Sequence, residues 1–184
     1  MRIICGKLKG KTIYPPMGYR ARPTTDFARE GLFSILDNEY EFDDLKVLDL
    51  FGGTGAVSFE FASRGVGRVW CVEMSRENAS FIKREAARLG LDNVVTVRDN
   101  VFDFLNICRE RFDIVFADPP YSIDGLENIP DKIVGQGLLH PGGYFILEHG
   151  GEHSFSGHPA FVKERSYGRV HFTFFEEPSP AENP

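Results

Sequence analysis

Short apolar runs alternate with helical patterns between residues 45 and 148, and this alternation constrains the fold more than any other feature of the chain. The runs are rich in β-branched and aromatic residues, whereas the segments between them place apolar residues on one helical face. Strands separated by helices are typical of βαβ units, in which helices cover both faces of a parallel sheet. The expected strands are 45–50, 69–73, 94–98, 112–117 and 143–148, and the expected helices are 56–64, 76–89, 101–107 and part of 125–137.

The last part of the chain changes character, because no helical pattern separates its final two strand-like runs. These runs, 160–165 and 169–175, flank a Ser-Tyr-Gly turn in which Gly168 can adopt the positive φ of a tight turn. The sequence therefore predicts an antiparallel hairpin at the end of a mainly parallel sheet.

A chain of 184 residues fits one domain with short additions at its two ends. Residues 1–25, rich in Gly, Lys and Pro, are expected to form a small strand pair or loop outside the sheet. The domain is expected at 26–176 and begins with a helix at 26–36, capped by one of two adjacent threonines. Residues 177–184 contain three prolines and no apolar anchor, which predicts a disordered tail.

Charge is distributed unevenly along the chain. The net charge is −6, yet residues 1–36 carry +5 and the remainder carries −11. This asymmetry predicts a basic N-terminal segment that contacts a polyanion, attached to an acidic domain with a different function. The alternative is a basic loop that is merely exposed to solvent. The candidate polyanion-binding residues are Arg2, Lys7, Lys9, Lys11 and Arg22.

Several residue types argue against other classes of protein. No apolar stretch is long enough for a membrane helix or a signal peptide, so we expect a cytoplasmic protein that does not contact membranes. The three cysteines lie far apart and the five histidines have no ligand spacing, so we expect no disulfide and no metal. The many phenylalanines are expected to fill the core between the sheet and its helices.

A glycine-rich segment between the first strand and its helix indicates a nucleotide-like ligand. Gly52, Gly53 and Gly55 allow the backbone to approach a ligand closely and expose the amides of a helix N-terminus. Glu73 follows Gly53 by twenty residues, the spacing at which an acid reaches ribose hydroxyls. The pair fits either NAD or S-adenosylmethionine.

Neighbouring residues favour S-adenosylmethionine. The third glycine of a dinucleotide motif is replaced by Ser58, and no P-loop string occurs. Asp49 would repel a pyrophosphate but could face a ligand that carries a sulfonium and an ammonium group. Asp99 and Asn100, after the third strand, could reach an adenine, or an acid here could cap the next helix.

The string Asp118-Pro119-Pro120-Tyr121 follows a central strand, at the sheet edge where α/β proteins bind ligands. The prolines restrict the backbone, so Asp118 and the Pro119 carbonyl could accept both hydrogens of an exocyclic amine. This grip would direct the nitrogen lone pair at a methyl donor, and Tyr121 could stack on a flipped base.

Taken together, these motifs resemble the class I S-adenosylmethionine-dependent methyltransferases, and specifically the RsmD family. The resemblance covers nearly the whole chain and is carried by Arg2-Ile3-Ile4-Cys5-Gly6, Gly10-Lys11, Arg22-Pro23-Thr24-Thr25-Asp26, Arg29-Glu30, the loop from Asp49 to Gly55, Glu73, Asp118 to Tyr121, and Tyr167-Gly168. It implies a Rossmann-like, doubly wound sheet of seven strands, mostly parallel with one antiparallel strand, and a small N-terminal extension that engages RNA.

The resemblance also implies a role for each matching residue. Asp49, Gly53 and Gly55 would hold the methionine part of S-adenosylmethionine, Glu73 the ribose, and Asp99 with Asn100 the adenine. The cofactor residues are then Asp49, Phe51, Gly53, Gly55, Glu73, Asp99 and Asn100, and the residues at the target base are Asp118, Pro119, Pro120 and Tyr121.

The function that the resemblance implies is methylation of the N2 amine of a guanine in 16S ribosomal RNA, with guanine-966 as the family target. The partner would be a small ribosomal subunit, assembling or assembled, and the enzyme a monomer. Alternatives are a DNA adenine-N6 methyltransferase, which the lack of a separate target-recognition domain disfavours, an NAD-dependent oxidoreductase, and a non-enzymatic RNA-binding module.

Overall fold

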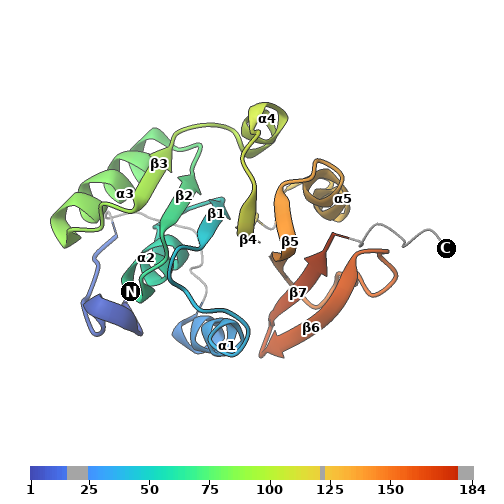
Figure 1. Ribbon diagram of the computed structural model, residues 1–184, viewed down its shortest axis with the longest axis horizontal. Coiled ribbons are helices and arrows are strands. Elements are labelled where there is room, and N and C mark those ends of the chain that lie inside the picture. The colour runs from blue at the N-terminus through green and yellow to red at the C-terminus, as the bar shows by residue number, and fades with distance from the viewer. Residues whose placement is uncertain (16–24, 121–122, 178–184) are drawn as a thin grey trace.

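Seven strands form a single sheet in the computed structural model, which describes residues 1–15, 25–120 and 123–177 (Figure 1). The order of the strands across the sheet is β3-β2-β1-β4-β5-β7-β6. The bounds are β1 Lys46–Leu50, β2 Arg68–Val72, β3 Val94–Val97, β4 Phe112–Ala117, β5 Leu139–His149, β6 Phe161–Tyr167 and β7 Val170–Glu176.

The five strands from β3 to β5 in this order are parallel to one another, and β7 runs antiparallel between β5 and β6. The expected fold class is thereby confirmed, including the terminal hairpin. Chain order reverses direction between β1 and β4, since β2 and β3 lie on one side of that pair and β5 on the other. In doubly wound sheets, ligands bind beyond the carboxyl ends of the strands at such a reversal.

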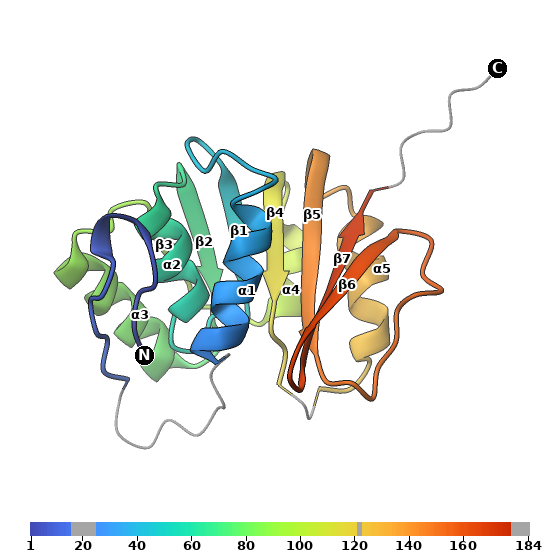
Figure 2. The same ribbon diagram turned by 90° about the horizontal axis from the view of Figure 1, so that it is seen from below.

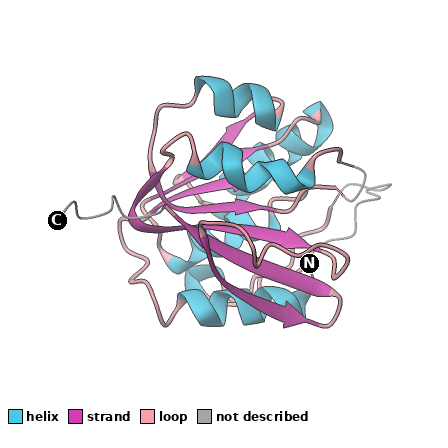
Figure 3. Ribbon diagram, turned by 90° about the vertical axis from the view of Figure 1, so that its right-hand side faces the viewer, coloured by secondary structure: helices cyan, strands magenta, loops and turns pink. Residues whose placement is uncertain are grey.

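Helices cover both faces of the sheet, as Figures 2 and 3 show. One apolar cluster joins the sheet to the helices α1, α2 and α3, and a second joins the opposite face to α4 and α5. Most of the phenylalanines are buried in these clusters, as expected, whereas Phe27 is exposed. The helix bounds are α1 Asp26–Leu36, α2 Ala56–Arg64, α3 Arg76–Leu89, α4 Val101–Ile107 and α5 Ile129–Val134, with 3-10 turns at Gly6–Leu8 (η1) and Leu126–Asn128 (η2).

Local capping explains why several helices begin where the sequence predicts. The Thr25 hydroxyl accepts the N–H of Ala28 at the start of α1, and the Ser75 hydroxyl accepts the N–H of Asn78 in α3. Each bond satisfies a backbone donor that has no partner within the helix. Gly90 ends α3 in the left-handed conformation, which glycine adopts without steric cost.

Strand β5 begins earlier than the expected residue 143. Leu139 pairs with Phe112 and Tyr144 with Ile114, so the intervening His-Pro-Gly-Gly segment forms an irregularity within the strand. Pro and Gly indicate a turn when they are considered locally, whereas the pairing of Leu139 with a distant strand is invisible in local sequence.

The N-terminal extension packs against α2, outside the sheet. Arg2 and Thr12 form an isolated antiparallel bridge, and Ile3 and Ile13 are buried in the cluster below it. The buried Glu60 carboxylate of α2 accepts the backbone N–H of Ile4 at 2.7 Å and that of Cys5 at 3.0 Å. The extension is therefore attached by both apolar and polar contacts. Apart from Glu177, the expected tail lies outside the described residues.

Candidate active site

Four residues lie at the carboxyl ends of four neighbouring strands, at one edge of the sheet. Leu50 of β1 pairs with Val72 of β2 and with Ala117 of β4, and Ala117 pairs with Leu147 of β5. The residues that directly follow these paired positions in the chain are Glu73, Phe51, Asp118 and Glu148, which we call the edge row.

The spacing of the edge row follows from the sheet. Adjacent strands lie about 4.8 Å apart, and residues directly opposite each other in a parallel pair point to the same face. Glu73 therefore lies two strands from Asp118, while Asp118 and Glu148 are direct neighbours. Hydrogen bonds continue the ladders into this row, since Gly52 N–H donates to Val72 O at 2.8 Å and Glu73 N–H to Val97 O at 3.0 Å.

Glu73 holds the glycine loop in place. One carboxylate oxygen accepts the N–H of Gly53 at 2.7 Å, and the other accepts the N–H of Ser75 at 2.7 Å. The loop has positive φ at three alternate positions around this bond, Phe51, Gly53 and Gly55. A positive φ costs a non-glycine residue energy, so its presence at Phe51 indicates a loop shape imposed by its surroundings.

Gly52 shows why this loop cannot carry side chains freely. A Cβ at Gly52 would lie 2.3 Å from the Cys71 sulfur of β2, a distance that real Cβ contacts do not reach. The loop therefore packs directly on β2, next to the strand end that carries Glu73. This close packing is what the glycine cluster predicts.

Asp49 lies behind the loop and is buried, with 2% of its surface exposed. Its carboxylate accepts hydrogen bonds from the N–H of Ser58, at 3.1 Å, and from the Ser58 hydroxyl. Burial, assisted by the charges of Asp118 and Glu73, raises the pKa of Asp49 to about 7 against the lowering effect of the Ser58 hydrogen bonds. Ser58, which argues against a dinucleotide-binding motif, is therefore the hydrogen-bond partner of Asp49, the acid that precedes the glycines in the sequence.

Asn100 is the N-cap of α4, and its side-chain oxygen accepts the N–H of Phe102 at 2.9 Å. Asp99 accepts the N–H of Asn100 at 2.8 Å. The helix cap that was one alternative for this pair therefore exists, but Asn100 supplies it. Contact of either residue with an adenine remains a prediction.

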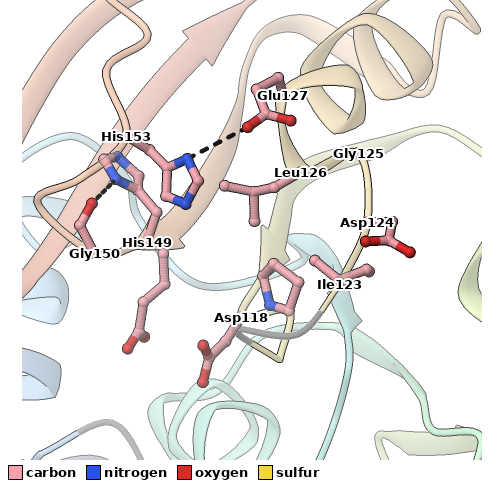
Figure 4. A pocket seen from close by; sticks show the side chains of 11 residues that line it. Asp118, Ile123, Asp124, Gly125, Leu126, Glu127, His149, Gly150 and His153 are labelled. Carbon is pink, nitrogen blue, oxygen red and sulfur yellow. Dashed lines mark hydrogen bonds and ion pairs between the residues drawn. The ribbon is translucent and has the colours of Figure 1, made fainter.

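A cavity of about 230 Å³ opens beside Asp118 (Figure 4). Two strand ends and the loop between β4 and α5 contribute its walls. The lining residues are Asp118, Pro119, Ile123, Asp124, Gly125, Leu126, Glu127, Glu148, His149, Gly150 and His153. The Pro120 carbonyl accepts the N–H of Ile123 at 2.9 Å, which directs the chain from the end of β4 into this wall. Tyr121 lies outside the described residues.

His149 lines one side of the cavity. Its Nδ1 lies 2.8 Å from the Gly150 carbonyl oxygen, which can only accept, and its Nε2 lies 2.7 Å from the Thr173 hydroxyl of β7. Burial lowers the pKa of His149 below its ordinary value of 6.5. The ring is therefore neutral at pH 7 and fixes the end of β5 against β7.

From its place at the end of the fifth expected strand, Glu148 could either border a pocket or simply cap that strand end, and the sequence gives no site role to His149 or His153. The sequence signal for these three residues was only their position, at or just after the end of the fifth expected strand. Figure 4 shows His153 directed toward Glu127, from which its Nδ1 lies 3.5 Å away. Among the described residues, no group of three or more His, Cys, Asp or Glu is placed to hold a metal ion.

The predicted polyanion-binding residues lie on the N-terminal extension. Lys7, Lys9 and Lys11 are exposed around η1. Arg2 is also exposed, but it lies 3.6 Å from Glu30 and 3.9 Å from Asp26 in ion pairs. Arg22 lies outside the described residues. In the described part of the chain, no helix has the length and apolar character to cross a membrane.

Comparison with known proteins relates the whole chain to methyltransferases. A family model described as Conserved hypothetical protein 95 matches residues 1–176. Ribosomal RNA small subunit methyltransferase D of Escherichia coli (strain K12) is 29% identical over 186 residues, which cover 100% of this chain and 93% of that protein. Putative rRNA methyltransferase YlbH of Bacillus subtilis (strain 168) is 31% identical, with 81% of this chain and 82% of that protein covered. A hypothetical protein of Thermus thermophilus has a similar structure, with a TM-score of 0.85, 32% identity, and 96% and 99% of the two chains covered.

Proposed function

The chain belongs to the RsmD family of S-adenosylmethionine-dependent methyltransferases, and we propose that it methylates the N2 amine of a guanine in small-subunit ribosomal RNA. The observation that carries this proposal is the edge row. Glu73 follows β2 and Asp118 follows β4, with β1 and its glycine loop between them, and this arrangement supports the proposal that Glu73 binds ribose hydroxyls and Asp118 binds the target amine. The names of the Escherichia coli and Bacillus subtilis relatives support ribosomal RNA as the substrate, and the family resemblance adds guanine-966 as the target.

The residues present suit S-adenosylmethionine as a ligand. Asp49, Glu73 and Asp118 surround the glycine loop with negative charge, and the last two raise the cost of ionising Asp49. A ligand with a sulfonium and an ammonium group relieves this repulsion, whereas a pyrophosphate adds to it. Both Glu73 oxygens accept one backbone N–H each and retain a lone pair for a hydroxyl group.

When bound, S-adenosylmethionine supplies a methyl group attached to a positively charged sulfur. Asp118 accepts a hydrogen from the target amine and directs the nitrogen lone pair along the line to this carbon. Transfer from this donor would form a carbon–nitrogen bond as the carbon–sulfur bond broke, and the electron pair of the broken bond would stay on sulfur. The alkylated nitrogen then loses a proton, first toward Asp118 and finally to water, so no strong base is needed before transfer.

The backbone after Asp118 supports this role. Two prolines fix φ, Pro119 is buried, and the Pro120 carbonyl closes a turn with Ile123. Asp118 therefore lines the cavity from a backbone position that the prolines restrain. Tyr121, which follows the two prolines in the sequence, is proposed to stack on the flipped base.

RNA is proposed to meet the basic N-terminal extension through Lys7, Lys9 and Lys11, together with Arg2 and Arg22. The rest of the molecule is acidic, which favours a folded small ribosomal subunit over bare RNA as the partner. We propose that the enzyme acts there as a monomer in the cytoplasm, without a metal.

The direct test is transfer of a labelled methyl group from S-adenosylmethionine to small ribosomal subunits, or to their RNA, isolated from cells that lack this gene. Nucleoside analysis of the product is expected to show the label in N2-methylguanosine. Label in another nucleoside would overturn the proposed target while retaining the methyl donor. No transfer to any RNA, despite measured cofactor binding, would overturn the proposed substrate class.

A further inference from the structure

We propose that Glu148 selects guanine by accepting the N1–H of the target base, beside the amine that Asp118 holds. This inference rests on the proposed function, because it concerns which base enters the cavity next to Asp118. It adds to that function the part of the base that is read and the residue that reads it.

Strand pairing brings the two residues to neighbouring places at the sheet edge. Phe116 pairs with Ile146 and Ala117 with Leu147, and the next residues in the chain are Asp118, directly after β4, and Glu148 of β5. Both line the same cavity, and Glu148 retains only 7% exposure. Two carboxylates on adjacent strands, about 4.8 Å apart at the backbone, match neighbouring hydrogen-bond donors on one edge of a base.

Glu148 lies in β5, a strand with neighbours on both sides, and its own backbone pairs with β7. On the side of β7, Glu148 pairs with Phe172 and His149 pairs with His171. The neutral His149 ring, fixed by the Gly150 carbonyl and by Thr173, anchors the next residue. A side chain carried by a central strand is better placed to discriminate than one on a loop.

Guanine is the base whose amine has a second donor beside it. Its Watson–Crick edge presents the two N2 hydrogens next to N1–H, so two adjacent carboxylates can accept three hydrogens. Adenine and cytosine present a ring nitrogen lone pair, N1 or N3, at the corresponding place beside their amines. A buried carboxylate facing that lone pair would lose its hydrogen bond and meet a second acceptor.

The arrangement therefore disfavours the DNA adenine-N6 alternative on chemical grounds. A site built to hydrogen-bond a substrate N–H rejects analogues without it by large factors, because the acceptor then faces a lone pair in place of a donor. Asp118 alone suits any exocyclic amine. The additional acid at position 148 supplies the preference for guanine.

2-Aminopurine tests this assignment, because it keeps the N2 amine but has a lone pair at N1. After the methylated guanine has been mapped, that position of the small-subunit RNA is replaced by 2-aminopurine through ligation of a synthetic oligonucleotide. We expect wild-type protein to transfer methyl groups to guanine at least ~100-fold faster than to 2-aminopurine. In Glu148→Gln the amide can donate to N1, and the ratio is expected to fall at least tenfold.

Two further variants separate reading of the base from damage to the fold. Glu148→Asp keeps the charge but withdraws it by one methylene, so transfer to guanine should slow without any gain on 2-aminopurine. Glu152→Gln changes an exposed acid four residues away that does not line the cavity, and it should retain the wild-type ratio. Thermal stability and cofactor affinity are measured for each variant.

An unchanged guanine to 2-aminopurine ratio in Glu148→Gln would overturn the inference. So would equal rates on the two bases with wild-type protein, since no residue would then read N1–H. Failure of the proposed function has a different signature, namely the absence of label in N2-methylguanosine with wild-type protein on unmodified subunits.

Discussion

At the scale of single residues, the site is defined by acids placed in apolar or crowded surroundings. Asp49 is buried behind the glycine loop, held by Ser58, and close enough to Asp118 and Glu73 for their charges to raise its pKa. The sequence identified Asp49 and Glu73 by their places relative to the glycine loop, and Asp118 by the Asp-Pro-Pro-Tyr string that it begins. It could not assign Glu148, since the pairing of β4 with β5 that brings Glu148 beside Asp118 is not encoded locally.

Asp49 makes the stability of the cofactor-free protein depend on pH. Its folded pKa of about 7 lies above the value of 3.8 for an unperturbed carboxyl, so the folded state binds more protons than the unfolded state between these values. Stability from this group is therefore lost as pH rises from about 4 to 7. Asp49→Asn removes the effect, and its free energy of unfolding relative to wild type should increase by about 2 kcal/mol between pH 5 and pH 8.

Urea unfolding at both pH values, with wild type and variant measured side by side, checks this prediction. The matched control is Asp92→Asn, since Asp92 is exposed in the loop before β3. A difference between Asp49→Asn and wild type that does not change with pH would contradict the buried, proton-binding state of Asp49.

At the scale of elements, boundaries set by local chemistry were predictable. Helices α1, α2 and α4 have the predicted ends, because the residues that cap or end a helix are its neighbours in the sequence and can be recognised there. The start of β5 was not predictable, since it depends on pairing with Phe112 rather than on its own Pro-Gly-Gly sequence. The glycine loop was recognised from its composition, but its contact with Cys71 required the packing of the loop on β2.

That contact predicts the effect of Gly52→Ala. The added methyl group would overlap the Cys71 sulfur, so the loop must move away from β2, at a cost of about 1–3 kcal/mol in the free energy of unfolding. Displacement of the loop should also weaken S-adenosylmethionine binding in calorimetry. Gly157→Ala is the control, because nothing lies within 4 Å of the position of its added Cβ.

The double variant Gly52→Ala/Cys71→Ala identifies the cause. Removal of the sulfur should recover part of the stability and affinity, giving a favourable coupling between the two changes. Additive losses would show that the Cys71 sulfur is not what excludes a side chain from Gly52.

At the scale of the whole molecule, the order of strands joins the motifs into one site. The alternation of strands and helices predicts an α/β sheet, and the family resemblance implies its seven strands with one antiparallel member. Composition alone does not give the order β3-β2-β1-β4-β5-β7-β6, because strand order depends on contacts between distant segments. The same long-range packing attaches the basic extension to α2 through Glu60.

The charge asymmetry predicts how RNA binding depends on salt. Replacement of Lys7, Lys9 and Lys11 by Gln should weaken binding to small-subunit RNA and reduce the slope of log affinity against log salt by about 1 for each phosphate that is no longer neutralised. Replacement of Lys46, Lys83 and Lys132, all exposed, removes the same charge elsewhere and should leave that slope near the wild-type value. Equal slopes for wild type and the first triple variant, measured by fluorescence anisotropy, would contradict the role of the extension.

The central claim is that Asp118 orients the amine that receives the methyl group, while the cofactor is held by other residues. The measurement that tests it most directly is single-turnover methyl transfer to small ribosomal subunits by Asp118→Asn, with S-adenosylmethionine affinity determined by calorimetry on the same preparation. We predict that transfer slows by about 100-fold or more, as for removal of an electrostatic interaction with a transition state, while the cofactor Kd stays within about threefold of the wild-type value. Transfer at the wild-type rate would contradict the account.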